Sequence, residues 1–150
     1  MTAAPAPVEI VVDAANVVGS RPDGWWRDRA AAATRLVQAL AALPGTMVPA
    51  PAGGDPAERG DLQVGRVFAV VEGQARQIPQ VSGVSLVRAA ADGDGEVVSA
   101  CRSVLAGGGV PLAVTADRGL RARLPEGTVV AGPQWLLAAL ERSEPEPGVG

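Results

Sequence analysis

The sequence predicts an α/β protein in which helices cover both faces of a mainly parallel, five-stranded sheet. Apolar runs alternate with helix-like segments along most of the chain, which is typical of β-α-β connectivity. The composition, with 47% hydrophobic and 19% charged residues, is that of a folded domain. A length of 150 residues suits one domain and its core. We therefore expect one three-layer α/β/α domain over residues 1–142, followed by a disordered tail, 143–150.

Five apolar runs bounded by Gly, Pro or Asp are interpreted as strands, because their length and β-branched content suit buried strands better than helices. They are residues 8–12 (VEIVV), 66–71 (RVFAVV), 84–88 (VSLVR), 111–115 (PLAVT) and 128–131 (TVVA).

Four segments between these strands are interpreted as helices. Apolar residues at helical spacing, or a proline suited to a first helical turn, support them. They are residues 25–43, 95–105, 118–124 and 133–141. Residues 21–24 are expected to form a turn. The Pro/Gly/Ala-rich stretch 44–61 lacks periodicity and is expected to be a long flexible loop.

Residue types that are missing exclude several classes of protein. The chain has no histidine and one cysteine, Cys101, so it has neither a histidine base nor a zinc ligand set. It has no lysine and hence no P-loop. The net charge of −3 argues against binding nucleic acid through the overall field. No signal peptide or membrane-spanning run is recognised, and a lone cysteine suits a reducing compartment, so we expect a cytoplasmic protein that does not bind membranes.

Carboxylates follow four of the predicted strands and are the main functional signal. They are Asp13, Glu72, the pair Asp92 and Asp94, and Asp117. The carboxyl ends of parallel strands meet at one crevice, where ligands bind. Converging carboxylates repel each other, and a divalent cation offsets that cost. Because all the donors are oxygen atoms, Mg²⁺ or Mn²⁺ is expected.

Helix capping is the alternative explanation, because Asp is a preferred N-cap and these strand ends are also helix starts. Asp94 and Asp117 could each be a cap. Capping explains neither Glu72, which is a poor N-cap type, nor the doubled Asp92 and Asp94.

Polar and aromatic residues near these strand ends are candidates for substrate contacts. Asn16 could orient a metal-bound water or a phosphate, and the Thr115 hydroxyl could face the crevice. Arg118 could hold a phosphate, whereas Arg123 is interpreted as part of a solvated helix face. Arg21 is a second candidate phosphate contact, with a surface salt-bridge network as the alternative. Of two adjacent tryptophans, Trp25 and Trp26, one is expected in the core, and the other could stack on a base.

Three motifs together resemble PIN-like NYN nuclease domains of the bacterial YacP-like kind, over about residues 8–140. The family's D-x-x-N after the first strand is matched by Asp13 and Asn16. Its D-x-x-[IV] at the third strand–helix junction is matched by Asp94 and Val97, and its [ST]-x-D after the fourth strand by Thr115 and Asp117. Many relatives have a second acid directly after the Asp94 position, where this chain has Gly95 and then Glu96.

The resemblance implies a PIN-like fold and metal-dependent cleavage of RNA. Asp13, Asp94 and Asp117 would then be the core ligands for Mg²⁺ or Mn²⁺, with Glu72, Asp92 or Glu96 completing the shell. Asn16 and Arg118 would position the scissile phosphate. RNA is the expected partner, and a homodimer is compatible with the sequence. A nucleotide pyrophosphohydrolase and a non-catalytic RNA- or protein-binding module remain as alternatives.

Overall fold

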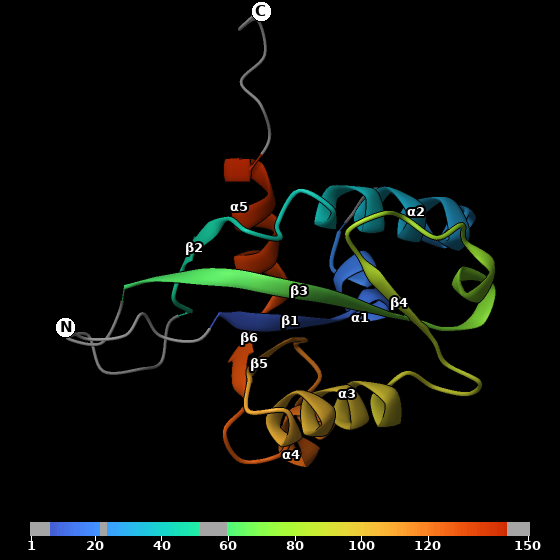
Figure 1. Cartoon of the computed structure of the whole chain (residues 1–150). Coiled ribbons are helices and arrows are strands. Elements are labelled where there is room, and N and C mark those ends of the chain that lie inside the picture. The colour runs from blue at the N-terminus through green and yellow to red at the C-terminus, as the bar shows by residue number, and fades with distance from the viewer. Residues whose placement is uncertain (1–6, 22–23, 52–59, 144–150) are drawn as a thin grey trace, which may run out of the picture.

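A mixed sheet organises the part of the chain that the computed structural model describes, residues 7–21, 24–51 and 60–143. Helices pack on both faces of this sheet (Figure 1). Within the described residues, six strands are present: β1 (Val8–Asp13), β2 (Met47–Pro49), β3 (Asp61–Val71), β4 (Ser85–Arg88), β5 (Val110–Val114) and β6 (Val129–Ala131). The helices are α1 (Ala14–Gly19), α2 (Arg29–Leu40), α3 (Asp94–Ala106), α4 (Arg118–Arg123) and α5 (Pro133–Ser143), with 3₁₀ turns η1 (Trp25–Arg27) and η3 (Gly73–Gln77).

The central strand is β1, which pairs in parallel with β3 on one side and β5 on the other. The order is β2-β3-β1-β5-β6, and β4 adds to β3 in parallel. β2 runs antiparallel to β3. The sheet is therefore mixed and has six strands in the described part of the chain, which corrects the expectation of five mainly parallel strands. β3 exceeds its predicted length because its first half pairs with β2, and its second half pairs with β4.

Alternate residues of β1 belong to two separate cores, as expected for a strand covered on both faces. Ile10 and Val12 belong to one core, which also contains Leu36 of α2 and Leu136 of α5. Val11 belongs to the other, in which strand residues pack against side chains of α3 and α4. Figure 1 shows α2 and α5 on one side of the sheet and α3 and α4 on the other. The chain thus has three layers, with the sheet in the middle.

Cys101 of α3 is fully buried in the second core. Burial raises the pKa of its thiol to about 11. The interpretation of this residue as a small core side chain is confirmed.

Two helical segments differ from prediction near the N-terminus of the chain. α1 was not predicted, because its Ala and Val residues continue the apolar run of β1. The predicted helix 25–43 is shorter at both ends. α2 begins at Arg29, where the Asp28 carboxylate caps the helix by accepting a 2.9 Å hydrogen bond from the backbone N–H of Ala31. η1 precedes α2 as a separate turn.

The predicted loop 44–61 contains ordered structure in its described part. β2 lies within it, and the Val48 side chain is only 2% exposed. The indole N–H of Trp135 in α5 donates a 2.9 Å hydrogen bond to the carbonyl of Pro49. The expectation of a loop without packing is therefore wrong for this segment, whereas residues 52–59 lie outside the described part. The predicted tail begins one residue too early, because Ser143 ends α5; residues 144–150 are not described.

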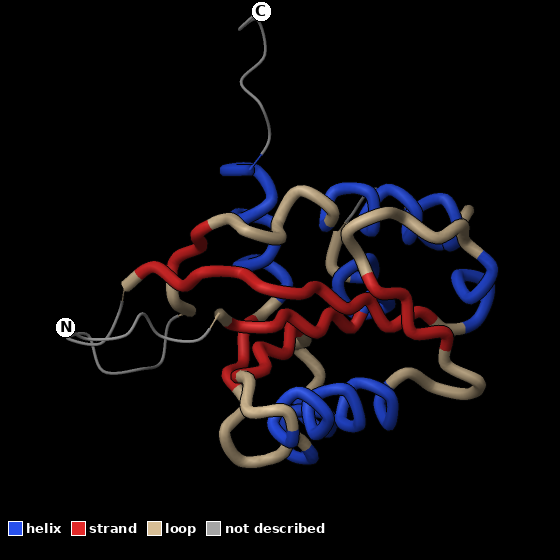
Figure 2. Tube along the Cα trace, viewed as in Figure 1, coloured by secondary structure: helices blue, strands red, loops and turns tan. Residues whose placement is uncertain are grey.

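Figure 2 shows the distribution of helix, strand and loop along the trace. Within the described residues, every helix is too short or too polar to cross a membrane.

Candidate functional site

The carboxyl ends of β1, β3, β4 and β5 lie at one edge of the sheet, because these strands are mutually parallel. Asp13 is the last residue of β1, and Glu72 directly follows β3. Asp94 begins the helix after β4, and Asp117 precedes the helix after β5. The topology therefore brings the predicted acidic residues to the same edge.

Asp13 is the buried member of the group, with 7% of its surface exposed. Its Oδ2 accepts a 3.0 Å hydrogen bond from the Thr115 hydroxyl, and its Oδ1 accepts one of 3.4 Å from the backbone N–H of Asn16. Burial raises the pKa of Asp13 from 3.8 to about 6, and the charges of Asp94 and Glu72 add to the rise. Two hydrogen bonds therefore hold the carboxylate in place, while burial disfavours its ionised form.

Thr115 and Asn16 connect the loops that follow β1 and β5. Thr115 is fully buried, and its Oγ1 also accepts a 3.1 Å hydrogen bond from the backbone N–H of Asp117. The Asn16 side-chain oxygen accepts a 2.8 Å hydrogen bond from the backbone N–H of Ala116. The structure thus places Asn16, Thr115 and Asp13 together, and these hydrogen bonds connect the loop after β5 to the end of β1.

Asp94 is the first residue of α3, and Gly93, rather than Asp94, occupies the N-cap position. Among the described residues, none donates a hydrogen bond to the Asp94 carboxylate. Partial burial and the charges of Asp117 and Asp92 raise its pKa. The capping explanation therefore fails for Asp94.

Capping does occur at Asp117 and Asp13. Asp117 Oδ1 accepts a 2.9 Å hydrogen bond from the backbone N–H of Leu120 and caps α4, while Asp13 caps α1. The Asp92 carboxylate accepts a 3.2 Å hydrogen bond from the backbone N–H of Asp94, which fixes the turn before α3. Three of the candidate acids thus have local structural roles in addition to their shared location.

Glu72 connects the end of β3 to the start of α3. Its Oε2 accepts a hydrogen bond from the backbone N–H of Gly93, and it does not cap the following turn η3. A side chain at position 93 would be tightly packed here: a Cβ would lie 3.2 Å from Glu72 Oε2 and 3.1 Å from Val70 Cγ1, so these neighbours would have to shift slightly. Gly93 therefore leaves room for the close approach of this carboxylate to the backbone.

Two of the predicted site residues line other surfaces. Glu96 lines a groove of about 410 Å³ that also contains Arg66 and Phe68 of β3. Arg21 lines a small depression between α1 and α2, together with Arg35. These two hollows are separate from the one that Glu72 and Asp92 line.

The arginines after Asp117 have different surroundings. Arg118 is exposed at the start of α4. Arg121 Nε donates a 2.8 Å hydrogen bond to the carbonyl of Thr115 and so supports the loop after β5. The positive charge of Arg123 lowers the pKa of Asp94, so this side chain lies within electrostatic reach of the acidic group. The interpretation of Arg123 as a solvated face alone missed that proximity, which depends on the packing of α4 beside α3.

The acidic group fits a hard divalent cation in its chemistry but not in its spacing. All donors are carboxylate oxygens, which Mg²⁺ and Mn²⁺ prefer, and the charges of neighbouring carboxylates add to the rise in the pKa values of Asp13 and Asp94. Within the described residues, however, no three Asp, Glu, His or Cys side chains are gathered closely enough to hold a metal ion. Binding a cation would therefore require the carboxylates to turn toward each other.

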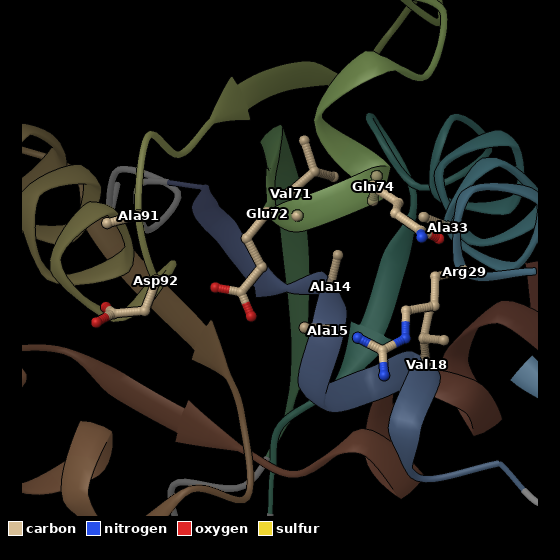
Figure 3. Close-up of a pocket in the computed structure, with 12 residues that line it drawn as sticks. Ala14, Ala15, Val18, Arg29, Ala33, Val71, Glu72, Gln74, Ala91 and Asp92 are labelled. Carbon is tan, nitrogen blue, oxygen red and sulfur yellow. The ribbon is translucent and has the colours of Figure 1, made fainter. Parts of the chain in front are cut away.

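A cavity of about 480 Å³ opens beside the carboxylates (Figure 3). Glu72 and Asp92 line it on one side, and Arg29 of α2 lies on the opposite side. Its inner surface is formed largely by alanine and valine side chains of α1, α2 and β3. No local sequence pattern indicated this cavity, because its walls come from segments far apart in the chain.

Comparison with known proteins identifies structures with a similar fold. No family model matches the sequence, and no curated protein matches it. The structure is similar to the crystal structure of Rae1 (YacP) from Bacillus subtilis, with 14% identity and a TM-score of 0.64, covering 89% of this chain and 74% of that chain. A tryptophan-to-leucine variant of the same protein matches with 14% identity and a TM-score of 0.63, covering 91% and 76%. The chain therefore has a YacP-like fold.

Proposed function

We propose that this chain is a metal-dependent endoribonuclease with a PIN-like NYN domain. The observation that carries the proposal is the shared location of Asp13, Asp94 and Asp117 at the carboxyl edge of the sheet, where Asp13 is buried and its pKa is raised to about 6. A buried charge that repels its neighbours is costly unless a ligand balances it. The YacP-like fold supports the same proposal, because the three sequence motifs resemble the nuclease family of that kind.

Each residue has a specific part in this proposal. Asp13, Asp94 and Asp117 would hold Mg²⁺ or Mn²⁺, with Glu72 or Asp92 as a further ligand. The bound cation would supply an activated water and stabilise charge on the phosphate. Hydrogen bonds of Thr115 and Asn16 fix the position of Asp13 relative to the loop after β5. Arg118 is exposed at the edge of the site and would bind the substrate phosphate.

The second candidate is a non-catalytic RNA-binding module. The spacing of the acidic side chains favours it, because no three of them in the described chain are gathered for a metal ion. Trp26, with 57% of its surface exposed, would then contribute base stacking on the surface.

Asp94→Asn tests the ribonuclease directly, because its carboxylate accepts no hydrogen bond from the described residues. Its fold should be unchanged, while Mn²⁺ binding by calorimetry and cleavage of a labelled single-stranded RNA should fall by at least about 100-fold, the upper end of what changes around a metal site cause.

Asp61→Asn is the matched control, since Asp61 is exposed at the amino end of β3, away from the site. It should bind Mn²⁺ and cleave as the wild type does. A wild-type protein that binds RNA but neither binds Mn²⁺ nor cleaves would favour the non-catalytic module.

A further inference from the structure

We propose that the cavity beside the carboxylates is a subsite for one nucleobase of the substrate RNA, an inference that rests on the proposed function. The cavity is partly open to solvent and has a volume of about 480 Å³. Small-molecule sites in proteins have volumes of roughly 300–1,000 Å³. The volume therefore suits one nucleoside of a strand whose neighbouring nucleotides stay outside.

The inner wall of the cavity suits the flat face of a base. Ala14, Val18, Ala33 and Val71 form its floor and are almost fully covered by their neighbours. Its accessible apolar surface comes from Ala15 and Ala91, which are exposed, and from Ala75, which is half-buried. Their side chains are short, so no long side chain from these positions fills the space. Covering accessible apolar surface with the ring of a base is favourable, whichever of the four bases enters.

The rim of the cavity supplies groups that bind the edge of a base. Figure 3 shows Glu72 and Asp92 on one side, with Gln74 and Arg29 on the other. Carboxylates accept hydrogen bonds from amino groups, the Gln74 amide both donates and accepts, and Arg29 donates. The two carboxylates would repel a phosphate placed between them. The ligand chemistry is therefore that of a heteroaromatic ring with polar edges.

The cavity borders the proposed active site through two acidic residues, Glu72 and Asp92. Glu72 lines it and also accepts a hydrogen bond from Gly93, the residue that precedes Asp94. Asp92, the second acidic lining residue, is hydrogen-bonded to the backbone of Asp94. A base held in the cavity would therefore bring an adjoining phosphate of the same strand to the carboxylates. The cavity would fix which phosphate of a flexible strand is presented for cleavage.

Ala15→Leu tests the subsite, because Ala15 is exposed on α1 and lines the cavity, so a larger side chain fills the space without disturbing the core. Ala138→Leu is the matched control, since Ala138 is an exposed helical alanine of α5 outside the cavity. Both variants are assayed on a labelled single-stranded RNA and on versions with one abasic nucleotide at each position in turn.

The expected result is a loss that depends on position. An abasic nucleotide at one fixed distance from a cleaved phosphate should slow cleavage there about tenfold, the scale of one stacked base. Ala15→Leu should slow cleavage of the intact RNA by a similar factor, and it should cause no further loss on that abasic RNA. Ala138→Leu should behave as the wild type on every substrate.

Two results would overturn the subsite: wild-type cleavage by Ala15→Leu, or losses from the variant and the abasic nucleotide that multiply. If the wild type does not cleave RNA, the same four combinations of wild type or Ala15→Leu with intact or abasic RNA are compared for RNA binding by fluorescence anisotropy. Coupling between the variant and the abasic position would then support the subsite while the ribonuclease fails. Binding of free nucleoside triphosphates that Ala15→Leu abolishes, with RNA unaffected, would overturn the assignment to an RNA strand.

Discussion

Asp13 stabilises the folded protein less when it is ionised than when it is protonated. Burial raises its pKa from 3.8 to about 6, so the folded state binds the proton more tightly than the unfolded chain. Stability without metal should therefore fall as pH rises through the window from 3.8 to about 6, and this rise in pKa corresponds to about 3 kcal/mol.

Asp13→Asn should remove that penalty. Above pH 6, the metal-free variant should be more stable by about 1–3 kcal/mol, because the amide keeps the shape but rearranges the hydrogen bond to Thr115. The gain should disappear below pH 4, where Asp13 is protonated in both states. Urea denaturation at pH 4 and pH 7.5 measures the difference. An equal effect at both pH values would show that the charge of Asp13 is not the cause.

Some site residues could be located from the sequence, because strand topology alone determines where they lie, whereas the contacts of others depend on the tertiary fold. Asp13, Asp94 and Asp117 could be predicted because parallel strands bring their carboxyl ends together. The surroundings of Glu96 could not be predicted, because the face of α3 on which it lies depends on where the helix begins, and Gly93, not Asp94, occupies the N-cap position. The buried contact between Thr115 and Asp13 joins residues 102 positions apart in the chain. No local pattern specifies such a contact.

At the scale of elements, the junction between β3 and α3 depends on the absence of a side chain at position 93. In Gly93→Ala, the added Cβ would approach Val70 and the Glu72 carboxylate at 3.1 and 3.2 Å. We expect a loss of about 1–3 kcal/mol in the free energy of unfolding, as for other overpacked sites. Cleavage should also fall, because Glu72 must move.

Gly95→Ala is the control for this substitution, since nothing lies within 4 Å of the Cβ that it adds in α3. This variant should gain about 0.4–1 kcal/mol, because alanine restricts the unfolded chain more than glycine does. Thermal melts of the two variants should thus shift in opposite directions. Equal shifts would show that helix propensity, and not the close approach of Glu72, governs position 93.

Elements with a strong local pattern were predictable, whereas those formed by distant partners were not. β1 and β5 are buried on both faces and read as continuous apolar runs. β2 has only three residues, and its order comes from its pairing with β3 and from the hydrogen bond of Trp135 to Pro49. Composition suggested a loop there, because no residue within the segment indicates that it pairs with β3 or contacts Trp135.

At the scale of the whole molecule, cation binding and folding should be coupled through the acidic edge. Mn²⁺ at about 100 times its Kd would add about 2.7 kcal/mol of stability. The resulting rise in Tm should be about 5–10 °C for a chain of this size at pH 7.5. Below pH 6, protonation of Asp13 should lower the affinity for Mn²⁺ about tenfold per pH unit, and the stabilisation should shrink accordingly. Differential scanning fluorimetry with and without EDTA measures it.

Asp94→Asn serves as the reference for that experiment, and its Tm should show no Mn²⁺-dependent rise at pH 5 or at pH 7.5. A rise that persists in this variant would place the stabilising cation elsewhere. A rise of equal size at pH 5 and pH 7.5 would show that Asp13 is not among the ligands.

The buried thiol of Cys101 makes the opening of α3 measurable as a chemical rate. It is the only thiol in the chain, and at pH 8 it is shielded by packing and largely protonated. A thiol reagent in excess should therefore modify it only as often as α3 separates from the sheet. The amino end of the same helix carries Asp94, so the labelling rate reports how long the site remains assembled between openings. Mn²⁺ should lengthen that interval in the wild type and leave it unchanged in Asp94→Asn.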